Sequence, residues 1–255
     1  MARIRFLYTN LWNAAGVAIS ANSAVSGLPA VASQNPDRTY VWRAVAGTGE
    51  AYLRVDLGSV KAASSVAIAN PVLKGGTAAK LQHLGDGATP GVAVDVATLT
   101  APNSQRKTSL AFFAEQSHRH WQILFPNPSA VDASAEAGYV HLGGYYEPPI
   151  NVRVPMAVTR HDPSQSRFSV DRQRSVTRRS KYCAGVIAFA DVSEAMLAEL
   201  QTQFDAIGTH STLFMVLDTA LDWTVWYCRF GADLEIGFGE MSGRYNPSVA
   251  WEEEV

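Results

Sequence analysis

Hydrophobic residues in the first 149 positions occur in short segments separated by clusters of Gly, Pro, Asn and Ser. In LRVDL the apolar Leu53, Val55 and Leu57 alternate with Arg54 and Asp56, which is the pattern of a strand with one buried face. Short alternating segments between turn residues predict an antiparallel β-sandwich. The expected strands cover residues 4–8, 52–57, 65–69, 79–84, 110–114, 121–125 and 138–142.

The stretch AYLRVDLGSVKAASSVAIAN, residues 51–70, joins two of these apolar segments through Asp-Leu-Gly. Gly58 permits the positive φ that a tight corner requires. Asp56 can accept a hydrogen bond from nearby backbone. The stretch therefore predicts a corner between two sandwich strands.

The pattern changes after EPPINVRVP, residues 147–155. Its prolines are excluded from a central strand and stiffen a linker. We therefore expect two domains, a sandwich over residues 1–149 and a smaller domain over residues 150–255.

The second half contains one predicted helix, between residues 192 and 207. Asp191 is the expected N-cap with Glu194 three residues on, and Gly208 is the expected stop. The apolar residues that share one face at helical spacing are Met196, Leu197, Leu200, Phe204 and Ile207.

Strand-like segments surround this helix, at residues 182–190, 212–217, 224–230 and 234–238. Strands flanking a single helix predict a small α+β domain with the helix packed on a sheet. The fold class expected for the whole chain is mainly β. The C-terminal EEEV is expected to be solvated.

Composition narrows the possible partners. A hydrophobic content of 47% with 17% charged residues favours a surface that other subunits partly cover. The net charge of -2 gives no electrostatic reason to expect sequence-specific nucleic-acid binding. No apolar segment has the length of a membrane span.

Two further features bear on the compartment. The N-terminus faintly imitates a signal peptide, but Thr9, Asn10 and Asn13 interrupt its apolar part, which favours a first strand. Cys183 and Cys228 lie in apolar segments, where buried free thiols are favoured over a disulfide. Sparse buried thiols favour assembly inside a cell.

Three segments resemble the discoidin-like, or galactose-binding-like, jelly-roll domain: residues 33–44, residues 51–70 and YVHLGGYYEPP at 139–149. Combined with the second half, the chain looks like virion structural proteins of tailed bacteriophages from the tail tip or baseplate. The second half is similar to them in its order of a basic hairpin, a strand, the helix, FMVLD and WYCRF.

This resemblance implies a structural protein of the virion, assembled in the host bacterial cytoplasm as a homo-oligomeric ring with other phage tail proteins. It also leaves open a carbohydrate-binding adhesin that recognises a glycan of the host surface. A glycan hydrolase is the least favoured class. No binding residue is transferred from the resemblance.

Candidate metal ligands are few. His118 and His120 share a face if their segment is extended, and His141 is the nearest possible third ligand. Without a supporting cysteine or acidic cluster, solvated or interface histidines are favoured, so we expect no metal and no cofactor.

Catalytic pairs are also weak. His161 and Asp162 have no recognisable nucleophile beside them. The carboxylate pairs suited to glycoside cleavage are ordinary turn residues here, so no catalytic residue is expected. These pairs are Asp218 with Asp222 and Asp86 with Asp95.

The main charge feature is RFSVDRQRSVTRRSK at Arg167–Lys181, with five arginines and one lysine against one aspartate. It predicts a hairpin that docks on an acidic neighbour, or a solvated hairpin, with the lining of a DNA passage as a third choice. WYCRF serves either the core or an assembly contact. The candidate assembly residues are Arg172, Arg174, Arg178, Arg179, Trp226 and Arg229.

Overall fold

The computed structural model describes residues 3–254 except 48, 74–77, 102–107, 127–133, 151, 154–155, 169–173, 219–223 and 240–242. The chain is mainly β, as predicted. Its first half contains β1 (Arg5–Leu7), β2 (Ala18–Ala21), β3 (Trp42–Arg43), β4 (Ala51–Ala69), β5 (Lys80–His83), β6 (Val94–Thr98), β7 (Thr108–Phe125), β8 (Glu136–Ala137) and β9 (Val140–Gly143), with 3-10 turns at Leu11–Asn13 and Ala30–Gln34.

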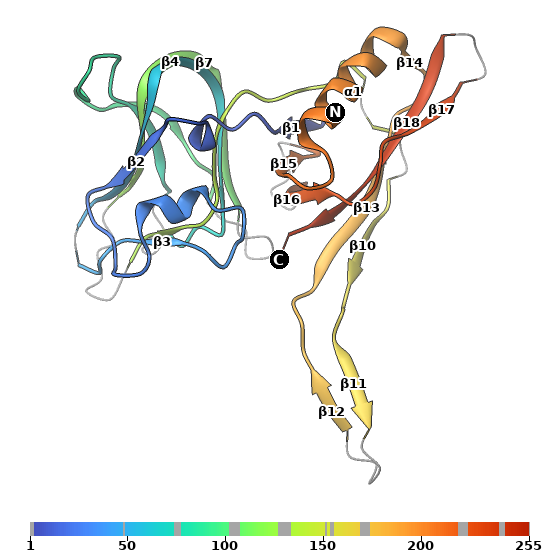
Figure 1. Cartoon of the computed structure of the whole chain (residues 1–255), viewed down its shortest axis with the longest axis horizontal. Helices are drawn as coiled ribbons and strands as arrows, with labels where there is room; N and C mark the ends of the chain where they lie inside the picture. The colour runs from blue at the N-terminus through green and yellow to red at the C-terminus, as the bar shows by residue number, and fades with distance from the viewer. Residues whose placement is uncertain are drawn as a thin grey trace.

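The second half contains β10 (Val158–His161), β11 (Gln165–Phe168), β12 (Arg174–Thr177), β13 (Tyr182–Ala188), β14 (Val192–Ser193), α1 (Glu194–Ile207), β15 (Thr212–Val216), β16 (Val225–Phe230), β17 (Glu235–Phe238) and β18 (Arg244–Glu253). Its sheet and helix stand beside the sandwich, and a narrow hairpin extends from it (Figure 1).

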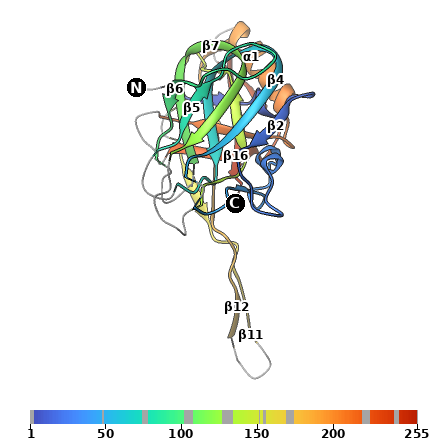
Figure 2. The ribbon, with the colours of Figure 1, turned by 90° about the vertical axis from the view of Figure 1, so that its left-hand side faces the viewer.

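The first half is built on the long antiparallel pair β4 and β7, which run side by side through the unit (Figures 1 and 2). The strand order is β2-β4-β7-β5-β6, and β9 pairs with β4. Leu53 and Val55 from one half of β4 meet Val66 and Ile68 from the other half in a single core. The bent pair therefore closes a sandwich, which confirms the predicted fold class.

The corner at Asp-Leu-Gly is a bulge within β4, and not a hairpin between two strands. The β4–β7 register shifts between Asp56 and Lys61, where Gly58 has a φ of 73°. The Asp56 carboxylate accepts a hydrogen bond from the Gly58 N–H at 2.8 Å. Arg119 donates to both oxygens of the same carboxylate, at 2.7 and 2.8 Å, and lowers the pKa of Asp56 to about 2.

The second sheet has the order β1-β15-β16-β18-β13-β10, with β14 and β17 paired to β18. Helix α1 buries Met196, Leu197 and Leu200 in a core shared with Trp226 and Trp251 of the sheet. The predicted small α+β unit with its one helix is therefore present.

The helix begins two residues later than the predicted Asp191 cap. The Ser193 hydroxyl accepts the Met196 N–H at 3.4 Å and is the N-cap. Residues 192–193 still pair with β18 as β14, so the backbone is extended up to the helix start. The predicted stop is confirmed, since Gly208 has a φ of 60° and donates to the Phe204 carbonyl.

Strand β1 departs from its expected place in the sandwich. It pairs with β15 in the second sheet, Arg5 opposite Val216 and Leu7 opposite Phe214. Phe6 and Leu7 are both buried but lie in different cores, so the strand needs apolar cover on its two faces. The domain boundary at residues 149 and 150 stays a prediction.

A third core joins the two halves. The alternation of β15 places Met215 in the core under the helix and Phe214 on the opposite face. On that opposite face, Phe214 and Tyr227 pack against Tyr139 of the first half, with ring centroids of Tyr139 and Tyr227 5.3 Å apart. The sandwich therefore packs on the sheet face opposite α1.

The C-terminal acidic run is part of the sheet, which corrects the solvated tail expected above. Glu252 and Glu253 end β18, and Glu253 accepts the Cys183 N–H at 3.0 Å. Pro247 within β18 concealed the strand, because proline is rarely found in a central strand.

The prediction for the cysteines is confirmed. Cys183 and Cys228 are free and buried. Burial raises the pKa of the Cys228 thiol far above its usual range, so this thiol is neutral at physiological pH.

Candidate functional site

Strands β11 and β12 form a ribbon that extends away from the rest of the molecule (Figures 1 and 2). In their antiparallel register Gln165 lies opposite Thr177 and Arg167 opposite Ser175. The two strands make a separate two-stranded sheet. Residues 165–167 and 175–181 are exposed. Among the described residues no other strand pairs with it, and an isolated two-stranded ribbon is at best marginally stable in water.

The base of the ribbon is fixed by side-chain contacts. The rings of His161 and Tyr182 stack at 5.0 Å where β10 meets β13. The Ser164 hydroxyl accepts the Arg179 N–H at 3.0 Å, and Lys181 Nζ lies 2.9 Å from Asp162 Oδ2. These contacts keep the hairpin extended from the sheet edge.

The hairpin carries uncompensated positive charge. Hydrogen bonds from Ser164 and the Lys181 ammonium hold the pKa of Asp162 well below its usual range, so its charge is matched to Lys181. Within the described part of the chain, Arg178 and Arg179 have no ion pair. They line an open hollow of about 460 Å³ at the ribbon base.

The structure describes the positions of some of the predicted hairpin arginines and not of others. Arg178 and Arg179 are exposed at the end of β12. Arg174 opens β12, its backbone opposite Phe168. Arg172 lies outside the described residues.

The WYCRF residues separate into two roles. Trp226 is fully buried, with its ring 5.0 Å from that of Trp251, so it serves the core and not a surface contact. Arg229 is at the surface, where its Nε lies 2.9 Å from both Glu252 Oε1 and Glu254 Oε1. The structure does not bring Trp226 or Arg229 to the hairpin.

His118 and His120 lie near each other at the loop of residues 86–87, whereas His141 lies elsewhere on β9. His118 Nδ1 lies 3.1 Å from Asp86 Oδ1, while His120 Nε2 lies 2.8 Å from the Gly87 carbonyl. His141 is buried on β9, and this burial lowers its pKa to about 3. Among the residues with described positions, no group of three His, Cys, Asp or Glu side chains is arranged to hold a metal ion.

Among the described residues, those considered above as catalytic pairs interact with other side chains instead of with each other. Asp162 is bonded to Ser164 and Lys181, and Asp95 to Lys80 at 2.7 Å. Asp222 lies outside the described residues, so its pairing with Asp218 is untested. That the chain is not an enzyme stays a prediction.

A polar groove of about 720 Å³ was not predicted from the sequence. It lies where the sandwich meets the second sheet, and Arg38 Nη1 donates across it to the Glu254 carbonyl. Its walls come from segments far apart in the sequence, which conceals it from pattern analysis. The polar residues that line it are Tyr8, Asn10, Asn13, Asp37, Arg38, Tyr139, His210, Ser211, Thr212, Arg229 and Glu254.

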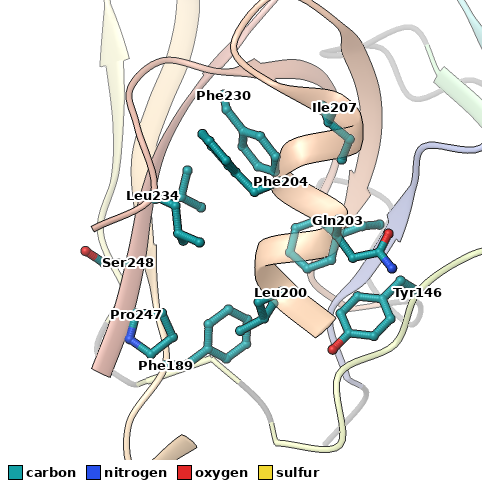
Figure 3. Close-up of a pocket in the computed structure, with 12 residues that line it drawn as sticks. Tyr146, Phe189, Leu200, Gln203, Phe204, Ile207, Phe230, Leu234, Pro247 and Ser248 are labelled. Carbon is teal, nitrogen blue, oxygen red and sulfur yellow. The ribbon is translucent and has the colours of Figure 1, made fainter. Parts of the chain in front are cut away.

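An apolar pocket lies between α1 and the sheet, where the rings of Phe204 and Phe230 stack at 5.5 Å (Figure 3). Leu200 and Leu234 face the same space (Figure 3). Its free volume is about 30 Å³, which is room for about two water molecules. It is a packing gap and not a ligand site.

No helix in the described ranges is long and apolar enough to cross a membrane. No protein-family model matches the sequence, and no curated protein matches it.

Several solved structures are similar to about half of the chain. Chitosan-binding module 1 of a chitosanase/glucanase from Paenibacillus sp. IK-5 has 17% identity and a TM-score of 0.45 over 53% of this chain and 98% of that one. The family 32 carbohydrate-binding module of C. perfringens NanJ has 19% identity and a TM-score of 0.41 over 56% and 99%. A Ruminococcus gnavus GH29 fucosidase has 14% identity and a TM-score of 0.44 over 55% and 27%. Similarities of this size assign neither a family nor a ligand.

Proposed function

We propose that this chain is a non-catalytic assembly subunit that docks on neighbouring subunits through the hairpin β11–β12. The observation that carries the proposal is an exposed two-stranded ribbon whose Arg178 and Arg179 have no ion pair within the described residues. The resemblance to phage tail-tip and baseplate proteins suggests which assembly this is: a homo-oligomeric ring in the virion, in contact with other tail proteins.

Docking on a neighbouring subunit explains two properties of the hairpin, its separate two-stranded sheet and its arginine side chains. In the described part of its own chain the ribbon pairs with no further strand, and contact with a neighbouring subunit would cover it. Its arginines bear a planar fork that binds carboxylates with two hydrogen bonds, a geometry favoured at interfaces. A hairpin that was merely solvated would gain nothing from either property.

The proposal predicts that the double change Arg178→Glu and Arg179→Glu weakens self-association. Opposing charges at a contact become like charges, so we expect the association constant to fall at least about tenfold near physiological salt. Sedimentation velocity over a concentration series measures this. Circular dichroism and the unfolding midpoint should be unchanged, because both side chains are exposed.

The matched control is Lys61→Glu with Arg153→Glu, which changes the net charge equally at two exposed positions away from the hairpin. It should associate like the wild type. A wild type that stays monomeric at high concentration, or a hairpin variant that associates normally, would overturn the proposed function.

A second candidate is glycan binding in the polar groove, whose volume of about 720 Å³ lies in the range of small-molecule sites. Tyr8 supplies an aromatic face, while His210 and Thr212 supply polar groups, the combination that binds sugar rings. The modules named above bind chitosan and galactose, but their likeness is too small to transfer a ligand. The candidate therefore depends on the groove alone.

The groove predicts binding of the full chain on a glycan array that includes galactose and chitotriose. The change His210→Ala should then weaken the best signal about tenfold in titration calorimetry, because a lost hydrogen bond to a buried ligand costs about 1–2 kcal/mol. His161→Ala, at the hairpin base, should leave it unchanged. An array without reproducible signal removes this candidate.

A further inference from the structure

Charge in the second half of the chain is divided between neighbouring segments. Residues 160–181 contain seven Lys or Arg and two Asp, a formal charge of 7 − 2 = +5. Residues 182–228 contain no Lys or Arg and six Asp or Glu, a formal charge of −6. The positive segment is the hairpin with its base, and the negative segment includes α1.

The outer face of α1 carries an exposed acidic residue near each end. Glu194 and Asp205 are exposed near its two ends, and neither has an ion pair in the described part of the chain. Glu199 lies between them in sequence but about 140° around the helix from Glu194, where it accepts a hydrogen bond from the Tyr146 hydroxyl at 3.2 Å. Apart from Glu199, the exposed positions between Glu194 and Asp205 are Ala195, Ala198, Gln201 and Thr202, of which three have short side chains. A second backbone can approach this face closely.

The end of α1 also lacks the cation that a helix favours there. The partial negative charge of a helix C-terminus is stabilised by Lys, Arg or protonated His in the last turn. The last turn of α1 has no basic residue and contains Asp205 instead. A positive group from outside the helix would therefore be attracted to this end by the acidic side chain and by the helix dipole together.

The hairpin of the same chain is too far from the end of α1 to supply this positive group. In both views the ribbon β11–β12 lies at one end of the second unit and α1 at the other (Figures 1 and 2). The base contacts at Asp162 and Ser164 hold the ribbon in its extended direction. A contact between the two surfaces must therefore join two copies of the chain.

We propose that the hairpin of one copy docks across the outer face of α1 of a second copy. This inference rests on the proposed docking function and names its partner. Glu194 and Asp205 are separated by about 16 Å along the helix, and the four paired positions of the ribbon, Gln165–Phe168 with Arg174–Thr177, span about 10 Å, so the ribbon covers more than half of the distance between the two acids. Each copy offers both surfaces, so the contact is head-to-tail and closes into a ring or extends as a filament.

The test uses full-length chains and two charge-reversed variants. One variant carries Arg178→Glu and Arg179→Glu, and the other Glu194→Lys and Asp205→Lys. Each variant alone presents like charges at the contact, so each should lose self-association at least about tenfold. An equimolar mixture pairs opposite charges at every contact and should associate again. Sedimentation velocity measures all three samples, with Glu50→Lys and Glu115→Lys as the control for the helix variant.

The outcomes separate the two proposals. If the hairpin variant is monomeric while the helix variant associates like the wild type, docking stands but α1 is not the acceptor. A mixture that stays monomeric also overturns the α1 contact. If the hairpin variant associates normally, both proposals fail. Restored association in the mixture supports a second copy as the partner, because complementary surfaces are then present only on two different copies.

Discussion

Replacing Gly143 by alanine is expected to destabilise the protein by about 3 kcal/mol, the upper end of the usual cost of overpacking, because the obstacle is backbone. A Cβ atom at this position would overlap the carbonyl oxygen of Thr9. The obstacle is backbone and not the end of a flexible side chain, so the strain is relieved only by moving one of two chain segments.

Neither segment is free to move. Asn10 donates to the Val140 carbonyl at 2.7 Å and accepts the Leu142 N–H at 3.1 Å, which fixes the chain after β1 against β9. This crossing is where the first strand, which belongs to the second sheet, returns to the sandwich. An alanine at Gly143 would therefore either break these hydrogen bonds or disturb the packing of the two halves.

The adjacent glycine supplies the matched control. A Cβ atom at Gly144 would have no neighbour within 4 Å, so Gly144→Ala should change stability by no more than about 0.5 kcal/mol. Urea unfolding of both variants and the wild type gives the comparison from the midpoints. Equal stabilities of the two variants would show that β9 and the segment at Thr9 do not approach each other this closely.

Local patterns were sufficient for the elements that local physics decides. The alternation at Leu53, Val55 and Leu57 predicts a strand, and all three side chains are buried. The apolar spacing from Met196 to Ile207 predicts the helix that packs on the second sheet. In both cases the buried face can be read from residues within one element.

Pairing over long sequence separations was not predictable in this way. Strand β1 is recognisable as a strand, but its apolar residues do not show that it pairs with β15 about 210 residues later. Strand β18 contains Asn246 and Pro247, which resemble a turn in sequence. Strands β11 and β12 are polar, and only their charge distinguished them.

The candidate surfaces also differ in whether local sequence or only the fold reveals them. The hairpin arginines are contiguous, so sequence identified them directly. The acidic face of α1 is visible in sequence once the helix bounds are known, yet its orientation away from the hairpin needs the fold. The polar groove combines residues near positions 8, 38, 139, 210 and 254, which no local pattern connects.

The second large effect is expected at acid pH and depends on His141. This side chain is 1% exposed on β9, with Ser65 Oγ 3.5 Å from its Nε2 and the Phe214 ring 6.2 Å away. Burial lowers its pKa to about 3, whereas an unfolded histidine has a pKa of about 6.5. Between these values the unfolded chain binds the proton and the folded chain does not.

The sign of the pH dependence follows from this difference. The contribution of neutral His141 to stability is fully present above about pH 6.5 and is lost as the pH falls towards 3. Each pH unit by which the pH falls between about 6.5 and 3 lowers the free energy of unfolding by up to about 1.4 kcal/mol. About 2–3 kcal/mol is therefore lost by pH 4.5. Urea unfolding at a series of pH values from 7.5 to 4 measures the slope.

The change His141→Gln removes the titrating group, so the variant should lose about 2–3 kcal/mol less than the wild type between pH 7 and 4.5, whatever its stability at neutral pH. The pKa of His83 is also lowered by burial, but His83 is present in both proteins and its effect cancels in the comparison. Parallel plots of unfolding free energy against pH for the wild type and His141→Gln would contradict this prediction, because the folded protein would then protonate the imidazole. Protonation requires water or a carboxylate beside the ring. The structure instead places Ser65 and the aromatic core that joins the two halves there.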